Sequence, residues 1–141
     1  ANEKGIMWFV ENVLPFTNNI ELTIAGNGMN QLKNKIDTNK IKLFDKVKDL
    51  KPLIDSADFF LIPIFHGSGM KVKTAEALMY GKNIIGTTEA FSGYNVDYNK
   101  VGALCNTKNE FIDFLKLFMK KTENKRTELG GQVVGAKLKT W

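Results

Sequence analysis

The chain has 141 residues, 43% of them hydrophobic and 25% charged, which is the composition of an ordinary globular domain with a sizeable core. A single cysteine, Cys105, excludes an internal disulfide, and a single histidine, His66, leaves no cluster for a zinc site. The formal net charge of +5 would suit phosphorylated ligands, nucleic acid or a membrane surface, so charge alone does not select among these classes.

The apolar runs of the chain are short. None approaches the roughly 18 apolar residues that a membrane-spanning helix needs, and the stretch at the start is too broken for a signal peptide. We therefore expect one soluble domain over residues 1–141 in a reducing, cytoplasmic setting.

The first half of the chain alternates helical and extended patterns. The expected elements, in order, are a helix over 6–16 closed by Pro15, a strand over 20–26, a short helix over 29–36, a strand over 41–47 and a helical turn through Leu50, Leu53 and Ile54.

The second half contains the most apolar strand. DFFLIPIF, residues 58–65, reads as a central strand covered on both faces, in which Pro63 is tolerated only near the end. The elements expected after it are a helix from Lys71 to Gly81, a strand over 83–87, a loop through Gly93, a strand over 101–105 and a helix over 109–121. We expect the polar tail, residues 120–141, to form one or two helices broken near Gly130 and Gly131.

This alternation predicts the fold class. Strands separated by helices of this size form right-handed βαβ units, so we expect an α/β, Rossmann-like parallel sheet with helices on both faces. Ligands in such sheets bind at the carboxyl ends of the strands. Because a doubly wound unit normally opens on a strand and this chain opens on a helix, we also expect its first strand to be missing from the sequence.

The segment HGSGMKVKTAEALMYGK, residues 66–82, begins where the most apolar strand ends. Gly67 and Gly69 permit a tight turn, and the first free amides of the following helix would form an anion cradle. A P-loop is disfavoured, because that motif requires Gly-Lys-Ser/Thr whereas Lys71 here lies between Met70 and Val72.

Two cations, Lys71 and Lys73, stand at the start of this helix. There they oppose the helix dipole, unless a phosphate or diphosphate lies between them and the amides. In the alternative interpretation, the glycines only turn the chain and both lysines reach into solvent.

Glu76 follows Lys73 by one turn, beside Ala75 and Met79 on the face that we expect to pack against the sheet. A buried carboxylate must be paired or ligated. Glu76 would therefore accept hydrogen bonds from a ribose diol or form an i,i+3 ion pair with Lys73.

Taken together, residues 57–93 resemble the C-terminal domain of the retaining glycosyltransferases of family four, which have the two-domain GT-B fold. The shared features are Ala-Asp before the strand, Pro63, the run Gly-x-Gly-x-Lys-x-Lys-x-x-Glu-Ala, Gly81-Lys82, and Thr87 before a glycine-containing loop. Weaker similarity covers residues 4–120.

The resemblance implies specific site residues. The diphosphate of a nucleotide-sugar donor would be bound by Gly67, Ser68, Gly69, Met70, Lys71 and Lys73, and Glu76 would contact the ribose. Ser68 stands where many members have an acid that touches the donor sugar. Lys4 resembles another phosphate-binding lysine. No metal or other cofactor is expected, and the catalytic residues stay unassigned.

The implied activity is hexosyl transfer with retention of configuration. The loop AFSGYN, residues 90–95, is similar to members that build bacterial surface polysaccharides. An N-terminal domain absent from this sequence would bind the acceptor, so the chain is expected to be an inactive part of a two-domain enzyme. The resemblance is also compatible with peripheral association of the full-length enzyme with the inner face of the membrane.

Two other functions remain open. The chain could be half of a nucleotide-sugar epimerase, for which His66 offers thin support, or a non-catalytic domain that binds a nucleotide or a partner protein. Nucleic-acid binding is not expected, because no stripe of interleaved basic and aromatic residues is present.

Overall fold

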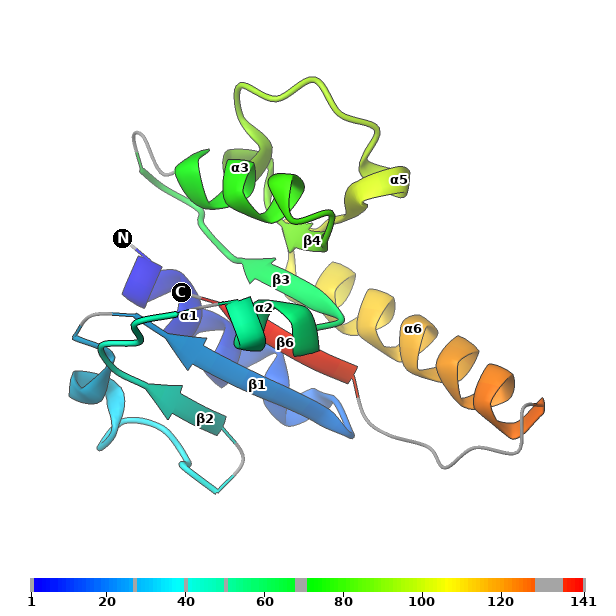
Figure 1. Cartoon of the computed structure of the whole chain (residues 1–141). Coiled ribbons are helices and arrows are strands. Elements are labelled where there is room, and N and C mark those ends of the chain that lie inside the picture. Colours follow the sequence, from blue (N-terminus) through cyan, green and yellow to red (C-terminus); the bar gives the residue numbers. More distant parts are fainter. Residues whose placement is uncertain are drawn as a thin grey trace.

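The computed structural model describes residues 2–26, 28–39, 41–49, 51–67, 71–128 and 136–140. Its helices and strands are α1 (Asn2–Asn12), η1 (Leu14–Phe16), β1 (Ile20–Ala25), η2 (Met29–Leu32), β2 (Ile41–Phe44), α2 (Lys51–Ser56), β3 (Phe59–Ile62), α3 (Lys71–Met79), β4 (Asn83–Gly86), α4 (Thr88–Phe91), α5 (Tyr98–Val101), β5 (Gly102–Leu104), α6 (Lys108–Glu128) and β6 (Ala136–Thr140). The described strands form one parallel sheet in the order β2-β1-β6-β3-β4-β5 (Figure 1). The α/β, Rossmann-like fold predicted from the alternation is confirmed.

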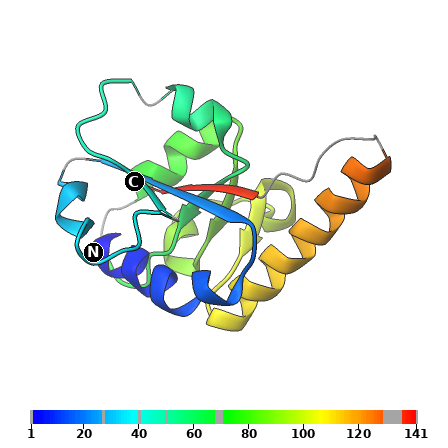
Figure 2. The same ribbon diagram turned by 90° about the horizontal axis from the view of Figure 1, so that it is seen from below.

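Helices cover both faces of the sheet, and the side chains of β3 alternate between the two layers. Phe59 and Leu61 belong to the core that includes residues of α1 and α6, whereas Phe60 and Ile62 belong to the core that includes residues of α2, α3 and α4. Figure 2 shows α1 and α6 on one side of the sheet and α2 and α3 on the other. All four residues of β3 are buried, as expected of a central parallel strand.

Several element ends differ from the prediction. The first α-helix stops at Asn12, and Pro15 lies in a short 3-10 turn that follows it. The expected helix over 29–36 is a 3-10 turn over Met29–Leu32. The expected loop through Gly93 is flanked by two short helices, α4 and α5, whose N-caps are the side chains of Thr87 and Asp97.

The prediction of one or two helices in the C-terminal tail is confirmed up to Glu128 and contradicted at residues 136–140. α6 extends to Glu128, and residues 136–140 form β6, which lies parallel between β1 and β3. Gly130 and Gly131, where a break was predicted, lie outside the described residues. The prediction was wrong because AKLKT has little of the β-branched and apolar character that marks a central strand. Pairing with two distant strands outweighs that local preference.

No helix in the described part of the chain is both long enough and apolar enough to cross a membrane.

Candidate functional site

The candidate site lies at the carboxyl end of β3. The chain leaves this strand through Pro63 and makes an exposed turn at His66 and Gly67. Gly67 has a φ of 150°, a region that other residues rarely adopt. Because α3 begins at Lys71, its N-terminus follows this turn as predicted. Outside the described residues lie Ser68, Gly69 and Met70, together with the side chain of Lys71.

Lys73 lies in the first turn of α3 and is partly buried. Burial lowers the pKa of its ammonium group from 10.5 to about 8, and the carboxylate of Glu76 opposes part of that change. Desolvation is the larger of the two effects, so Glu76 compensates it only in part. A partly desolvated cation at the positive end of a helix is electrostatically unfavourable, and a bound anion would reduce this free-energy cost.

Glu76 is half-buried, but the predicted orientation of its helix needs correction. Met79, placed on the sheet-facing side in the sequence analysis, is 85% exposed. The fully buried positions of α3 are Thr74 and Ala77, which share a face at i,i+3 spacing. Glu76 therefore lies beside the buried face. Its effect on the pKa of Lys73 is compatible with the i,i+3 pair as well as with a ligand contact.

Two buried threonines, for which the sequence pattern predicts no role in the site, connect its elements through hydrogen bonds. The hydroxyl of Thr74 donates to the carbonyl oxygen of Ala90 at 2.6 Å. The hydroxyl of Thr87 donates to the carbonyl oxygen of Ile64 and accepts a hydrogen bond from the amide of Ala90 at 3.2 Å. The resemblance already includes Thr87, and a threonine directly after an apolar strand is a recognisable N-cap pattern, so its capping role could also have been predicted from the sequence. Nothing in the sequence marks Thr74.

The turn at Gly67 borders a pocket of about 760 Å³. Its described lining consists of Lys4, Gly5, Trp8, Phe65, His66 and Gly67. Trp8 and Phe65 meet edge to face with ring centroids 4.7 Å apart, which gives the pocket an aromatic wall. Lys4 and His66 add polar groups. The pocket thus combines a surface suited to a flat or apolar group with a cation.

Close approach of α1 to the end of β3 assembles this pocket. A Cβ at Gly5 would lie 1.8 Å from the carbonyl oxygen of Pro63, so only glycine fits there. The contact brings Lys4 to the pocket that Gly67 borders, although the two residues are far apart in the sequence.

Comparison with known proteins identifies the family. Residues 1–120 match the family described as "Glycosyl transferases group 1". The chain belongs to this family. It is also similar to an "Uncharacterized 44.6 kDa protein in cps region" of Klebsiella pneumoniae, with 28% identity over 118 residues. That match covers 74% of the group 1 chain and 30% of the relative, so the chain spans about a third of that protein's length. No solved structure matches significantly.

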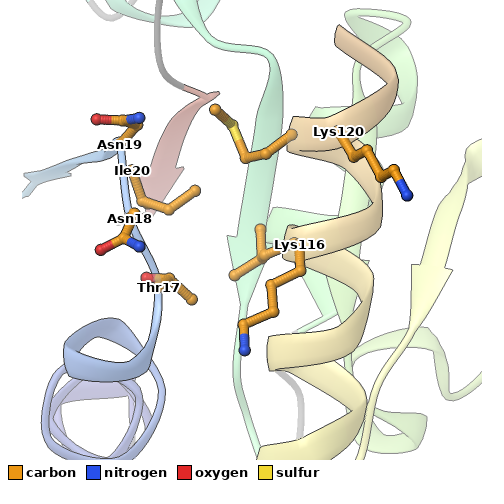
Figure 3. Close-up of a pocket in the computed structure, with 8 residues that line it drawn as sticks. Thr17, Asn18, Asn19, Ile20, Lys116 and Lys120 are labelled. Carbon is orange, nitrogen blue, oxygen red and sulfur yellow. The ribbon is translucent and has the colours of Figure 1, made fainter. Parts of the chain in front are cut away.

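A second pocket of the group 1 chain, of about 280 Å³, lies where the chain enters β1 (Figure 3). Its lining includes Thr17, Asn18, Asn19, Ile20, Lys116 and Lys120. In Figure 3, Lys116 points toward the β1 side of the pocket and Lys120 points away. This is the amino end of a parallel strand, whereas ligands of such sheets bind at the carboxyl ends. We therefore assign the candidate site to the pocket beside Gly67.

Two observations concern possible metal ligands and the single thiol in the part of the group 1 chain that the structure describes. There, no group of three or more His, Cys, Asp and Glu side chains is placed to hold a metal ion. Cys105 is buried, and burial, with a smaller contribution from Glu110, raises the pKa of its thiol to about 12. The thiol therefore stays protonated at neutral pH and is a poor nucleophile.

Proposed function

We propose that this group 1 chain is the donor-binding C-terminal half of a retaining glycosyltransferase of the GT-B fold, with residues 1–141 as one domain. The observation that carries the proposal is the partly desolvated ammonium of Lys73 in the first turn of α3, directly after the Gly67 turn. A donor diphosphate bound there would accept hydrogen bonds from the helix amides and from Lys71 and Lys73.

Neighbouring residues would hold the rest of the donor. Glu76, one helical turn beyond Lys73, would accept hydrogen bonds from the two ribose hydroxyls. Lys4 would supply a further cation from across the pocket. The turn residues Gly67, Ser68, Gly69 and Met70 would provide backbone amides and room for close approach of the phosphates.

The proposed reaction transfers a glycosyl group to an acceptor hydroxyl with retention of configuration. The bond between the anomeric carbon and the diphosphate oxygen breaks, and its electron pair stays on that oxygen, where lysines and amides stabilise the charge. The acceptor oxygen bonds to the same face of the anomeric carbon, and its proton passes to the departing diphosphate oxygen. Since the diphosphate is stabilised by protein groups, we expect activity to resist a chelator. An N-terminal domain would bind the acceptor, so the chain by itself would be inactive.

The biological setting is proposed from the relative. Its printed name places it in a cps region, which supports a role in bacterial surface polysaccharide biosynthesis. Such an enzyme would act in the cytoplasm, with peripheral association at the inner face of the membrane.

An epimerase is less well supported. His66 lines the pocket, but none of the described lining residues is an acid, and an epimerase needs acids near the sugar. Product analysis with a labelled donor and the full-length enzyme separates the alternatives. A retained glycoside supports the proposal, and an epimerised donor or an inverted product contradicts it. A domain that only binds the nucleotide would give neither product.

Calorimetric titration with nucleoside diphosphates, and with the corresponding nucleosides, tests the site. Replacing Lys71 and Lys73 by Ala should weaken diphosphate binding by about 1.5–3 kcal/mol for each charge-assisted hydrogen bond that the substitution removes, and leave nucleoside binding nearly unchanged. The matched control replaces Lys116 and Lys120 at the other pocket, which removes the same charge at a distance from the site. If the Lys71 and Lys73 double variant lost equal affinity for the diphosphate and for the nucleoside, the proposal would be contradicted. Equal losses of diphosphate affinity in the two double variants would contradict it as well.

A further inference from the structure

β5 is an edge strand of the sheet, because it pairs with β4 and no other described strand lies beyond it. The amide of Cys105 donates to the carbonyl oxygen of Gly86 in β4 at 2.9 Å. Backbone groups of successive residues in a strand point to opposite edges, so the N–H and C=O groups of Leu104 point away from β4. The outer edge of β5 therefore presents a donor and an acceptor with which no described strand pairs.

A groove of about 500 Å³ follows this edge, and residues 102–105 line it together with parts of α5 and α6. Each of the two helices contributes an aromatic side chain. Tyr98 of α5 packs edge to face on Phe91, with ring centroids 5.0 Å apart, and Phe114 of α6 packs in the same way on Phe59 at 5.5 Å. Phe91 and Phe59 belong to opposite layers of the core, so a strand added at this edge would meet an aromatic side chain on either face.

The charged residues that line the groove are all acidic. They are Asp97, Glu110 and Asp113, and all three are exposed. Asp97 accepts a hydrogen bond from the amide of Asn99 at 3.1 Å, and Glu110 accepts one from the amide of Thr107 at 3.1 Å. These bonds hold two of the carboxylates in place at the ends of their helices.

Neighbouring cations do not neutralise these acids. No lysine or arginine whose side chain the structure describes forms an ion pair with any of the three. Lys108 lies over the ring of Phe16, 3.9 Å from its centroid, and Lys116 points toward the β1 side of the other pocket (Figure 3). Lys100 of α5 does not line the groove. The groove is therefore acidic, although the chain as a whole has a formal net charge of +5.

We propose that the groove at the outer edge of β5 is a docking site for an extended, basic segment of a partner protein. The segment adds a strand to the sheet through hydrogen bonds with Leu104. Its Lys or Arg side chains reach the three acids, and their methylene stems cover Tyr98 and Phe114. A second copy paired through the same edge would bring two sets of acids together, and this repulsion disfavours that occupant. The inference does not depend on the proposed glycosyl transfer.

Three synthetic peptides test the proposal. The probe alternates arginine and valine, is about seven residues long, as a typical strand is, and is blocked at both ends. The first control has Glu in place of every Arg. The second keeps every side chain but carries an N-methyl group on each inner amide, which removes the donors of a strand. Calorimetric titration measures affinity, and amide hydrogen exchange followed by NMR compares Leu104 with Cys105.

The arginine peptide should bind and slow the exchange of the Leu104 amide at least about tenfold. The Cys105 amide should change less, because it is already hydrogen-bonded to β4. The Glu peptide should not bind, since its charges match those of the groove. The N-methylated peptide should bind at least about fivefold more weakly, because the hydrogen bonds of the added strand are lost.

Variants of Leu104 test the backbone contact. Leu104→Pro removes the outward N–H group, which does not take part in the ladder with β4. Leu104→Ala loses packing as well but keeps this donor, so it is the matched control. Only the Pro variant should lose affinity for the arginine peptide. If it does not fold, the comparison of the N-methylated and unmethylated peptides on the wild-type chain makes the same test.

Variants of the acids test the charge. Asp97→Asn with Asp113→Asn should weaken binding of the arginine peptide at least about threefold. The matched control is Asp49→Asn with Glu11→Gln, which removes the same charge from residues that do not line the groove. Asp49 resembles Asp97 in accepting a hydrogen bond from the amide two residues later. The control should bind as the wild type does.

Other outcomes overturn the proposal. Absence of binding by the arginine peptide would show that the edge is not a docking site. Equal affinity for the N-methylated peptide would show that the acids attract cations without strand addition. Equal affinity for the Glu peptide, or equal losses in the two double variants, would contradict the charge complementarity. Protection of the Leu104 amide that rises with protein concentration in the chain alone would assign the edge to a second copy.

Discussion

The hydroxyl of Thr74 donates a 2.6 Å hydrogen bond to the carbonyl oxygen of Ala90, and both residues are buried. This bond fastens α3, which carries Lys73 and Glu76, to α4. The placement of the candidate site relative to the sheet therefore depends on a buried polar contact as well as on apolar packing.

Thr74→Val should lower the free energy of unfolding by about 1–3 kcal/mol, because it removes the donor to a buried carbonyl while nearly preserving the volume. Thr74→Ser keeps the donor and is the matched control. Urea unfolding of the three proteins measures the difference. A Val variant as stable as the wild type, or a Ser variant that is less stable than the Val variant, would show that the hydrogen bond does not matter.

Diphosphate binding should depend on pH through Lys73. In the free chain this ammonium group has its pKa lowered by burial to about 8, and a bound anion would favour the protonated form. Binding at pH 9 should therefore take up a proton, and affinity should fall as the pH rises above about 8. Calorimetry at pH 7 and pH 9 in buffers of different ionisation enthalpy measures the uptake. Lys73→Arg, which stays charged, should abolish it, and equal uptake by both proteins would exclude Lys73 as its source.

The stability of the unliganded chain should change with pH in the opposite direction. Because burial lowers the pKa of Lys73 from 10.5 to about 8 on folding, the unfolded chain binds more protons between these values. This residue's contribution to stability therefore rises with pH over that window and is constant below it. Lys73→Met should stabilise the chain at neutral pH and make its stability rise less as the pH increases through this window. Denaturant unfolding at pH 7.5 and pH 9.5 compares the two proteins, and identical pH dependence would contradict the assignment.

Glu76→Gln distinguishes a ribose contact from an ion pair. If the carboxylate binds both ribose hydroxyls, the substitution should weaken ribonucleoside diphosphate binding by about 1.5–3 kcal/mol and deoxyribonucleoside diphosphate binding by less. If Glu76 only pairs with Lys73, stability should change by at most about half a kcal/mol and both ligands should respond alike. The four affinities form a double-mutant cycle, and a coupling energy of zero would defeat the ribose contact.

The fold was largely predictable because covered parallel strands are apolar in sequence. Residues 58–65 were identified as central from composition, and the structure places Pro63 immediately after β3. The end of α3 was predicted from Gly81, which has a φ of 67° and follows the helix as a cap. In both places a local rule determines the backbone structure, so the sequence is sufficient to predict the central strand and the end of α3.

The remaining features depend on contacts that no local pattern reveals. The orientation of α3 was misjudged because KVKTAEALM has no single apolar stripe, and its burial is decided by Thr74 and Ala77 against neighbouring elements. The approach of Lys4 to the site follows from the contact of Gly5 with Pro63, which joins distant segments. β6 was missed because its pairing partners lie in the first half of the chain.

The central position of β6 also has a consequence for synthesis of the chain on the ribosome. β6 is the last of the described strands to be made, yet Ala136 pairs with Ile20 in the first strand. Contacts of such large sequence separation form slowly, since the chain between them must first lose its freedom. Before β6 is made, none of the other described strands pairs with the inner edges of β1 and β3, whose amides and carbonyls then invite aggregation. These two edges are therefore where we expect a chaperone to engage the growing chain.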